Sequence, residues 1–132
     1  MRSVRKCGER GAITVWTAVV LIGFIVIIGI GVDFSGHARA TQEARGIAAE
    51  AARAGQQHLK LTSGNLKPSP DIAKQAAEKY VAASRFRGTA QMISGTVIEV
   101  KVTGEYTCMF LNIIGIRTLP VRAEGTSELH SS

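Results

Sequence analysis

The sequence predicts an α+β protein in which a long N-terminal helix crosses a membrane and continues outside it, followed by a helix packed on a small antiparallel sheet. Three observations support this prediction: an uncharged stretch at residues 12–32, an alanine-rich segment directly after it, and alternating apolar and polar residues beyond residue 88. A chain of 132 residues leaves room for one small domain beside the membrane anchor.

The anchor is the segment 12–32, AITVWTAVVLIGFIVIIGIGV, which contains no charged residue. As a helix it would be about 31 Å long, close to the roughly 30 Å of a bilayer's hydrocarbon core. Thirteen of its residues are Val, Ile, Leu or Phe, which favour insertion by roughly 4–8 kcal/mol. A small domain could not surround a helix that is apolar on every face, so we expect a transmembrane helix rather than a buried core helix.

Basic residues before the anchor predict its direction. Residues 1–11 form a leader with a net charge of +3, half of the total of +6. Because positive segments stay on the cytoplasmic side, we expect a cytoplasmic N-terminus and an extracytoplasmic C-terminal domain. The basic residues concerned are Arg2, Arg5, Lys6 and Arg10. An alternative is a secretory signal cut after Ala40, because residues 38–40 (ARA) have the small-x-small form that cleavage prefers.

Residues 33–61 predict a helical extension outside the membrane, because alanine, which recurs there at every fourth position, has the highest helix propensity. A stripe of small residues lets a second helix approach closely, and the same spacing appears at the membrane edge, one position off the alanine register. The expected helix–helix contacts are Gly31, Ser35, Ala40, Ala44, Ala48 and Ala52. In the alternative interpretation, the alanine face packs on the chain's own globular part.

Residues 69–132 predict the small α+β head. Residues 69–71 (SPD) are typical of a helix start, and the helical apolar pattern continues to about Arg87, with Gly88 as the stop. Alternation at residues 98–102 predicts a half-buried strand, preceded by a short strand around residues 90–93 and a tight turn at 94–95. Alternation at residues 119–123 predicts another strand. Because Pro120 cannot donate to a ladder, we expect this strand to lie at an edge or to begin near Pro120.

The most apolar stretch outside the anchor is YTCMFLNIIG at residues 106–115, which we interpret as a strand followed by a turn at 112–115. It fills the core in one interpretation; in the other it is a subunit contact or a lip that touches the membrane. Cys108 is expected to behave as a small buried hydrophobic residue. It cannot pair with Cys7 within one inserted chain, because the anchor separates them.

Asp33 is the acidic residue that we single out. It lies where the helix leaves the bilayer, so it could meet a basic residue or a terminal amine of a neighbour, or it could be a solvated carboxylate. The sequence contains no nucleophile elbow, phosphate-binding glycine loop or C-x-x-C motif, and its three histidines are far apart. We therefore expect no enzyme, cofactor, metal site or small-molecule substrate. The dilute basic charge also argues against specific nucleic-acid binding.

Short motifs follow one another in an unusual order. They are RGAITVW at residues 10–16, GVD at 31–33, ARA at 38–40 and EAARAG at 50–55, followed by IIG at 113–115 and LPVRA at 119–123. In this order the chain resembles the TadE/TadG-like minor pilins, or pseudopilins, of tight-adherence (Flp) pilus systems. The last two motifs are similar to that family's closing hairpin.

The resemblance implies a prepilin-like protein, cut by a prepilin peptidase between Gly11 and Ala12. Trp16 occupies the position at which many type IV-like pilins have a glutamate, so a full-length anchored pseudopilin or an accessory assembly factor stays open. The implied partners are membrane lipid and other pilin-like or pilus-assembly membrane proteins. A different possibility is an anchored or shed head that binds DNA or a surface through its basic residues.

Overall fold

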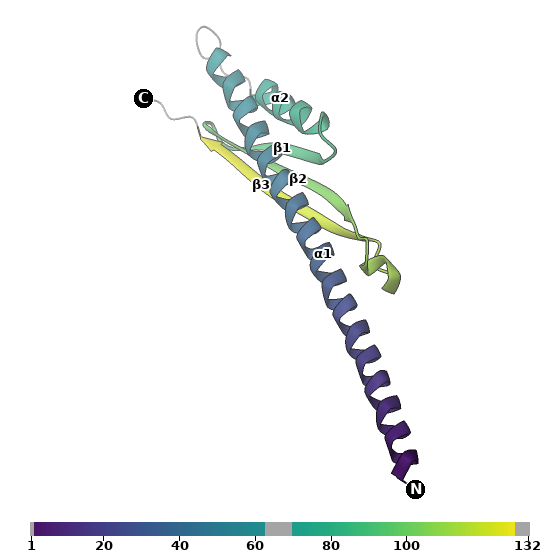
Figure 1. Cartoon of the computed structure of the whole chain (residues 1–132). Coiled ribbons are helices and arrows are strands. Elements are labelled where there is room, and N and C mark those ends of the chain that lie inside the picture. Colours follow the sequence, from purple (N-terminus) through teal and green to yellow (C-terminus); the bar gives the residue numbers. More distant parts are fainter. Residues whose placement is uncertain (1, 63–69, 129–132) are drawn as a thin grey trace.

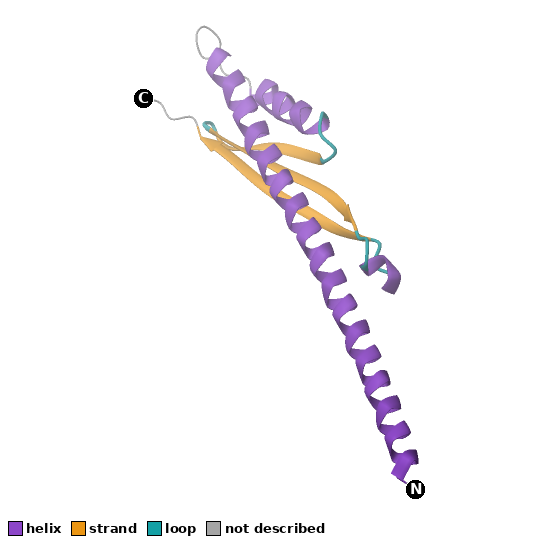
Figure 2. Cartoon of the chain, in the orientation of Figure 1, coloured by secondary structure: helices purple, strands orange, loops and turns teal. Residues whose placement is uncertain are grey.

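A computed structural model describes residues 2–62 and 70–128 of the chain (Figure 1). The elements are α1 (Arg2–Thr62), α2 (Pro70–Ala82), β1 (Arg87–Ser94), β2 (Val97–Thr107), the short 3-10 helix η1 (Leu111–Ile114) and β3 (Thr118–Glu128). This order confirms the predicted α+β class. Figure 2 shows one very long helix, with the second helix and the sheet gathered along its C-terminal half.

Helix α1 has 61 residues and passes the end of the apolar segment without a break. It begins earlier than the predicted start at residue 12. Among the described residues, it is the one helix that is long and apolar enough to cross a membrane. Its large apolar side chains within residues 12–32 remain uncovered, as the exposed fractions of Trp16 (71%) and Ile27 (67%) show. The arrangement fits a single-pass membrane protein.

The sheet is antiparallel with the strand order β1-β2-β3, so β2 is central and β3 is an edge strand, as Pro120 predicted. One face is apolar: Ile98, Val100 and Val102 of β2 are fully buried. Across β2, Val100 pairs with Ala90 on one side and with Gly125 on the other. The alternation read at residues 98–102 is therefore confirmed, and the turn that precedes it lies at residues 95–96.

The alanine face of α1 covers this apolar face of the sheet. Ala44, Ala48 and Ala52 are fully buried and Ala40 is 4% exposed, all within the same core cluster. Strand β3 crosses α1 at backbone distance, because a Cβ on Gly125 would lie 2.5 Å from the carbonyl carbon of Ala48. These four alanines therefore pack on the chain's own globular part, as the alternative interpretation proposed. They are covered by the chain's own head, so in this fold they offer no exposed surface to another chain.

Helix α2 packs beside α1 on the same face of the sheet, with Ala73, Ala77 and Val81 buried. It ends at Ala82, whereas the apolar pattern predicted a helix to about Arg87. The hydroxyl of Ser84 donates to the carbonyl oxygen of Val81 (2.6 Å) and accepts from the backbone N–H of Phe86 (3.2 Å). The chain turns at this point, and the ring of Phe86 packs over Gly104 as part of the core.

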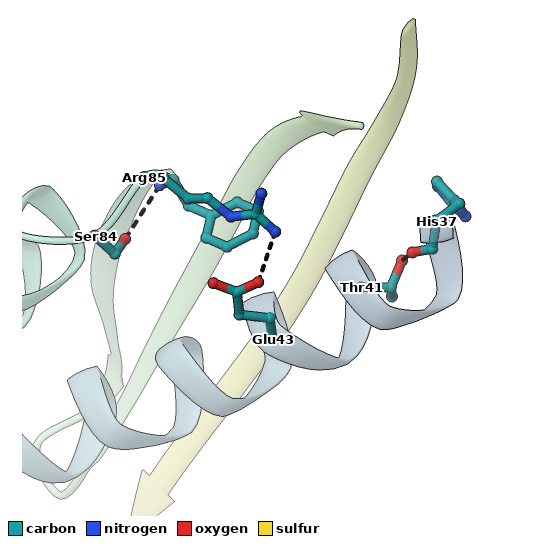
Figure 3. Close-up of polar contacts among 6 residues, drawn as sticks. His37, Thr41, Glu43, Ser84 and Arg85 are labelled. Carbon is teal, nitrogen blue, oxygen red and sulfur yellow. Dashed lines mark hydrogen bonds and ion pairs between the residues drawn. The ribbon is translucent and has the colours of Figure 1, made fainter. Parts of the chain in front are cut away.

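Polar contacts hold the head along α1 at several heights. Figure 3 shows the carboxylate of Glu43 facing the guanidinium of Arg85. The nearest oxygen and nitrogen of the two groups lie 2.6 Å apart. Nearer the membrane, Nε2 of His37 lies 2.9 Å from the carbonyl oxygen of Pro120. At the far end, the side-chain amide of Gln56 donates to the carbonyl oxygen of Glu128 (2.5 Å). Strand β3 therefore follows α1 over most of the strand's length.

Candidate functional site at the membrane edge

The connection between β2 and β3 folds back onto α1 at the end of the membrane-spanning segment, beyond the lower end of the sheet (Figure 1). We call residues 108–117 the apolar tip. Its two ends are joined by a hydrogen bond from the N–H of Cys108 to the carbonyl oxygen of Arg117 (2.8 Å). Gly115 closes the turn after η1 in a left-handed conformation, with a φ of 97°.

Asp33 attaches the apolar tip to α1. One of its carboxylate oxygens accepts the backbone N–H of Met109 (2.8 Å), and the other accepts those of Phe110 (2.9 Å) and Leu111 (2.7 Å). The hydroxyl of Tyr106 also interacts with this carboxylate and helps to lower its pKa. Asp33 has no exposed surface and is the buried charged residue of the described chain. A buried carboxylate is stable when its oxygens are fully hydrogen-bonded in this way.

The structure contradicts the interpretation of Asp33 as a solvated carboxylate. The carboxylate is not solvated, and it is enclosed by its own chain rather than open to a neighbour's basic group. The physical reason is that the tip presents three consecutive backbone N–H groups at the start of η1, which need an acceptor that the short helix cannot supply. Asp33 is that acceptor.

Glycines on either side of Asp33 bring the tip and β2 close to the helix. A Cβ on Gly29 would lie 2.9 Å from the ring of Phe110, and one on Gly36 would collide with the hydroxyl of Tyr106. Residues 29, 33, 36 and 40 are spaced by four, three and four positions, so they share one face of α1. We call this set the docking face. It continues the alanine face down to the membrane edge.

The hydrogen bonds decide the charge state of this cluster. Burial by itself raises the pKa of Asp33, but the three backbone N–H bonds and the Tyr106 hydroxyl outweigh burial, so the pKa lies below its usual value of 3.8. Burial raises the pKa of Tyr106 and of Cys108, and the charge of Asp33 raises both further. At neutral pH the carboxylate is therefore ionised, while the phenol and the thiol keep their protons.

The apolar tip does not fill the core, contrary to that interpretation of residues 106–115. Ile113 is 83% exposed, and Met109 and Ile114 are each 71% exposed. Cys108 is buried, as expected. A shallow apolar groove of about 140 Å³ runs between the tip and α1, lined by Ile25, Val26, Gly29, Ile30, Phe110, Leu111, Ile113 and Ile114.

Gly31 and Ser35 point away from the docking face and are exposed. A Cβ on Gly31 would have no neighbour within 4 Å. Both residues border an open groove of about 520 Å³ on α1, together with Ile28, Val32, Gly36, Arg39 and Tyr106. The structure thus separates the small residues expected to act together into a covered set, the four alanines, and an uncovered pair.

The expected cleavage site and the basic leader form the start of α1. Gly11 and Ala12 are helical and exposed, and Arg10 is exposed as well. The first turns of the helix contain Arg2, Arg5 and Lys6, whose side chains are not described. The predicted helix cap Ser69 lies outside the described residues.

The contact between the tip and the docking face was missed in the sequence, although one signal pointed to it. Counting back from Ala40 in steps of four reaches Gly36, so the line of small residues continues to the membrane edge. Asp33 lies one helical turn before Gly36 on the same face. An acid in line with a small-residue face indicates a buried anchoring role, but the N–H groups that it binds lie 76 to 78 residues further along the chain.

Comparisons with known proteins agree with the resemblance seen in the motifs. No curated protein and no solved structure matches this chain. A family model described as "Putative Flp pilus-assembly TadE/G-like" matches residues 11–77, which is half of the chain. The match begins at Gly11 and includes the membrane-spanning segment, the docking face, the alanine face and most of α2. The chain therefore belongs to the TadE/G-like Flp pilus-assembly family.

Proposed function

We propose that this chain is a membrane-anchored pilin-like subunit, or an accessory factor, for assembly of a Tad/Flp-type pilus or a related secretion or adhesion apparatus. The basic leader favours a cytoplasmic N-terminus and an extracytoplasmic head. A pilus-assembly family supports a structural role, so we propose that the chain acts by lateral contacts and not by catalysis.

The observation that supports this proposal most directly is the uncovered side of α1 at the membrane edge. Helices in lipid associate through small residues that let their backbones approach, because lipid supplies no hydrophobic force between them. Gly31 and Ser35 offer such a place, one turn apart, and the head leaves both uncovered. The proposed partner is the apolar helix of another pilin-like or pilus-assembly membrane protein.

Photocrosslinking in native membranes tests this partner surface. A photoreactive residue at position 35 should give an adduct with another pilus-assembly protein. Gly31→Leu should reduce that adduct severalfold by keeping the backbones apart. Gly23→Leu is the matched control, because Gly23 is also an exposed glycine of the membrane-spanning segment without a neighbour within 4 Å. Absence of an adduct at position 35, or equal loss in both variants, would contradict the proposal.

Processing can be read from the mass of the mature N-terminus. We propose that the mature chain begins at Ala12 after prepilin-type cleavage, or at Met1 in an uncut pseudopilin. Cleavage after Ala40 is disfavoured, because it would remove Asp33 and Gly36 and leave the N–H groups of the tip without an acceptor. Detection of Thr41 as the first residue would contradict this proposal.

The alternative, a head that binds DNA or a surface through basic residues, has one observation in its favour. A shallow hollow of about 530 Å³ on the head is bordered by Arg85, Arg87 and Arg122. Glu105 also borders it, and Arg85 is paired with Glu43. We therefore expect weak DNA binding by the detergent-solubilised chain. A steep fall in affinity across a salt series would instead favour the alternative.

A further inference from the structure

The apolar tip lies beside a part of α1 that belongs inside the bilayer. Phe110 packs on Gly29, which is four residues, about 6 Å, before Asp33 along the helix axis. Ile113 and Ile114 border the same groove as Ile25, about 10 Å before the end of the uncharged segment. If residues 12–32 span the hydrocarbon core, the tip reaches the depth of the outer leaflet.

The surface of the tip suits lipid better than water. Residues 109–116, MFLNIIGI, contain no charge and one polar side chain, Asn112. The exposed fraction of Ile113 is 83%, which is higher than that of Trp16 in the membrane-spanning segment itself. Arg117, exposed directly after these residues, is the first charge on the returning chain and suits the headgroup layer.

The backbone of the tip is also prepared for an apolar environment. Irregular backbone enters the hydrocarbon region only when its polar groups are satisfied within the protein. The N–H groups of Met109, Phe110 and Leu111 bind Asp33. Those of Ile113, Gly115 and Ile116 bind carbonyl oxygens of the tip, at distances of 3.0–3.1 Å. Asp33 therefore satisfies three N–H groups that would be costly to place unpaired in lipid.

We infer that the apolar tip inserts into the outer leaflet of the membrane and gives the head a second lipid contact beside α1. The occupant of its exposed surface is lipid acyl chain, because that surface continues the lipid-facing surface of α1 without an intervening charge. The head is consequently held at a fixed height and angle on the bilayer. This inference depends on the membrane anchor and is independent of any pilus partner.

Depth-dependent quenching of tryptophan fluorescence in the full-length chain tests the inference. The chain is reconstituted alone into phosphatidylcholine vesicles, after Trp16→Phe removes its single tryptophan. Ile113→Trp then places an indole on the tip at a site that is 83% exposed, so that the fold loses no packing. The matched control is Ile93→Trp, since Ile93 is an isoleucine of the same head, 61% exposed, at the far end of β1.

The indole at position 113 should emit at shorter wavelength and be quenched by lipids brominated in the upper half of the acyl chain. The indole at position 93 should emit as in water and escape that quenching. Two results would overturn the inference: long-wavelength emission at position 113 with quenching by aqueous iodide, which means that the tip lies in water, or short-wavelength emission without quenching by brominated lipid, which means that protein covers it.

Discussion

The two halves of α1 have opposite surroundings. Beyond Ala40 one face of the helix is covered by its own sheet and by α2, so closely that Gly125 of β3 has no room for a side chain against Ala48. In the segment 12–32 the same helix is exposed around most of its circumference, and Gly29 is the residue that the head buries there. One half is therefore part of a folded core, and the other half depends on lipid or on neighbouring helices.

The comparison shows that small residues at a spacing of four do not define one kind of contact. The alanines allow the backbone of the chain's own β3 to approach, whereas Gly31 and Ser35 leave an open groove. Between the two halves, the docking face continues the alanine face with Asp33 as its polar member. The following changes would break or sharpen this contrast.

The largest effect is expected at the junction itself. Asp33→Asn replaces a charged acceptor of three backbone N–H groups by an amide with one oxygen, and it buries an NH₂ group beside those donors. The tip should detach from α1. Amide hydrogen exchange at residues 109–111 should become faster by about tenfold or more.

Asp71→Asn is the matched control, because Asp71 is an exposed acid in the first turn of α2. It should leave exchange in the tip unchanged. Equal protection of the tip amides in the wild type and in Asp33→Asn would show that the carboxylate does not hold the tip.

A second, smaller effect separates the covered from the uncovered small residues. Ala48→Leu must fit three extra carbons under β3, where Ala48 has no exposed surface, so the head should lose about 1–3 kcal/mol of unfolding free energy. Gly31→Leu enters open space and should change it by less than about 1 kcal/mol, in the stabilising direction, because leucine has the higher helix propensity.

Denaturant unfolding of both variants in the same detergent measures this difference. A stable Ala48→Leu head would mean that the alanine face is not packed against β3. A destabilised Gly31→Leu head would mean that the groove beside Gly31 is filled by the chain itself.

Lowering the pH from neutrality should have the smallest effect on the attachment of the tip. The folded-state pKa of Asp33 is lowered, so its contribution to stability is complete above the unfolded-state pKa and is lost as the pH falls through the folded-state pKa, below 3.8. Exchange protection at residues 109–111 should therefore be constant from pH 7 to pH 5, after correction for intrinsic exchange, and fall only in strong acid. Asp33→Asn should lack this acid-dependent loss.

Parts of the head follow from local pattern, and other parts do not. The alternation of residues 98–102 was sufficient to identify β2 and its buried side, because side chains in a strand alternate between the two faces. The predicted end of α2 was wrong. An apolar residue at position 86 fits a helical pattern, but it fits equally well a loop residue whose ring packs over Gly104. The apolarity of residues 106–115 was evident, but whether they face a core, a partner or lipid was not.

The sequence by itself indicated a membrane-spanning segment and an edge position for β3. Both depend on composition within a short window: an uncharged stretch that is long enough to cross a bilayer, and a proline that cannot donate to a ladder. Only the tertiary structure decided which small residues are covered and what Asp33 binds. These outcomes depend on where β3 crosses α1 and on N–H groups 76 to 78 residues away, and no local pattern encodes such a distance.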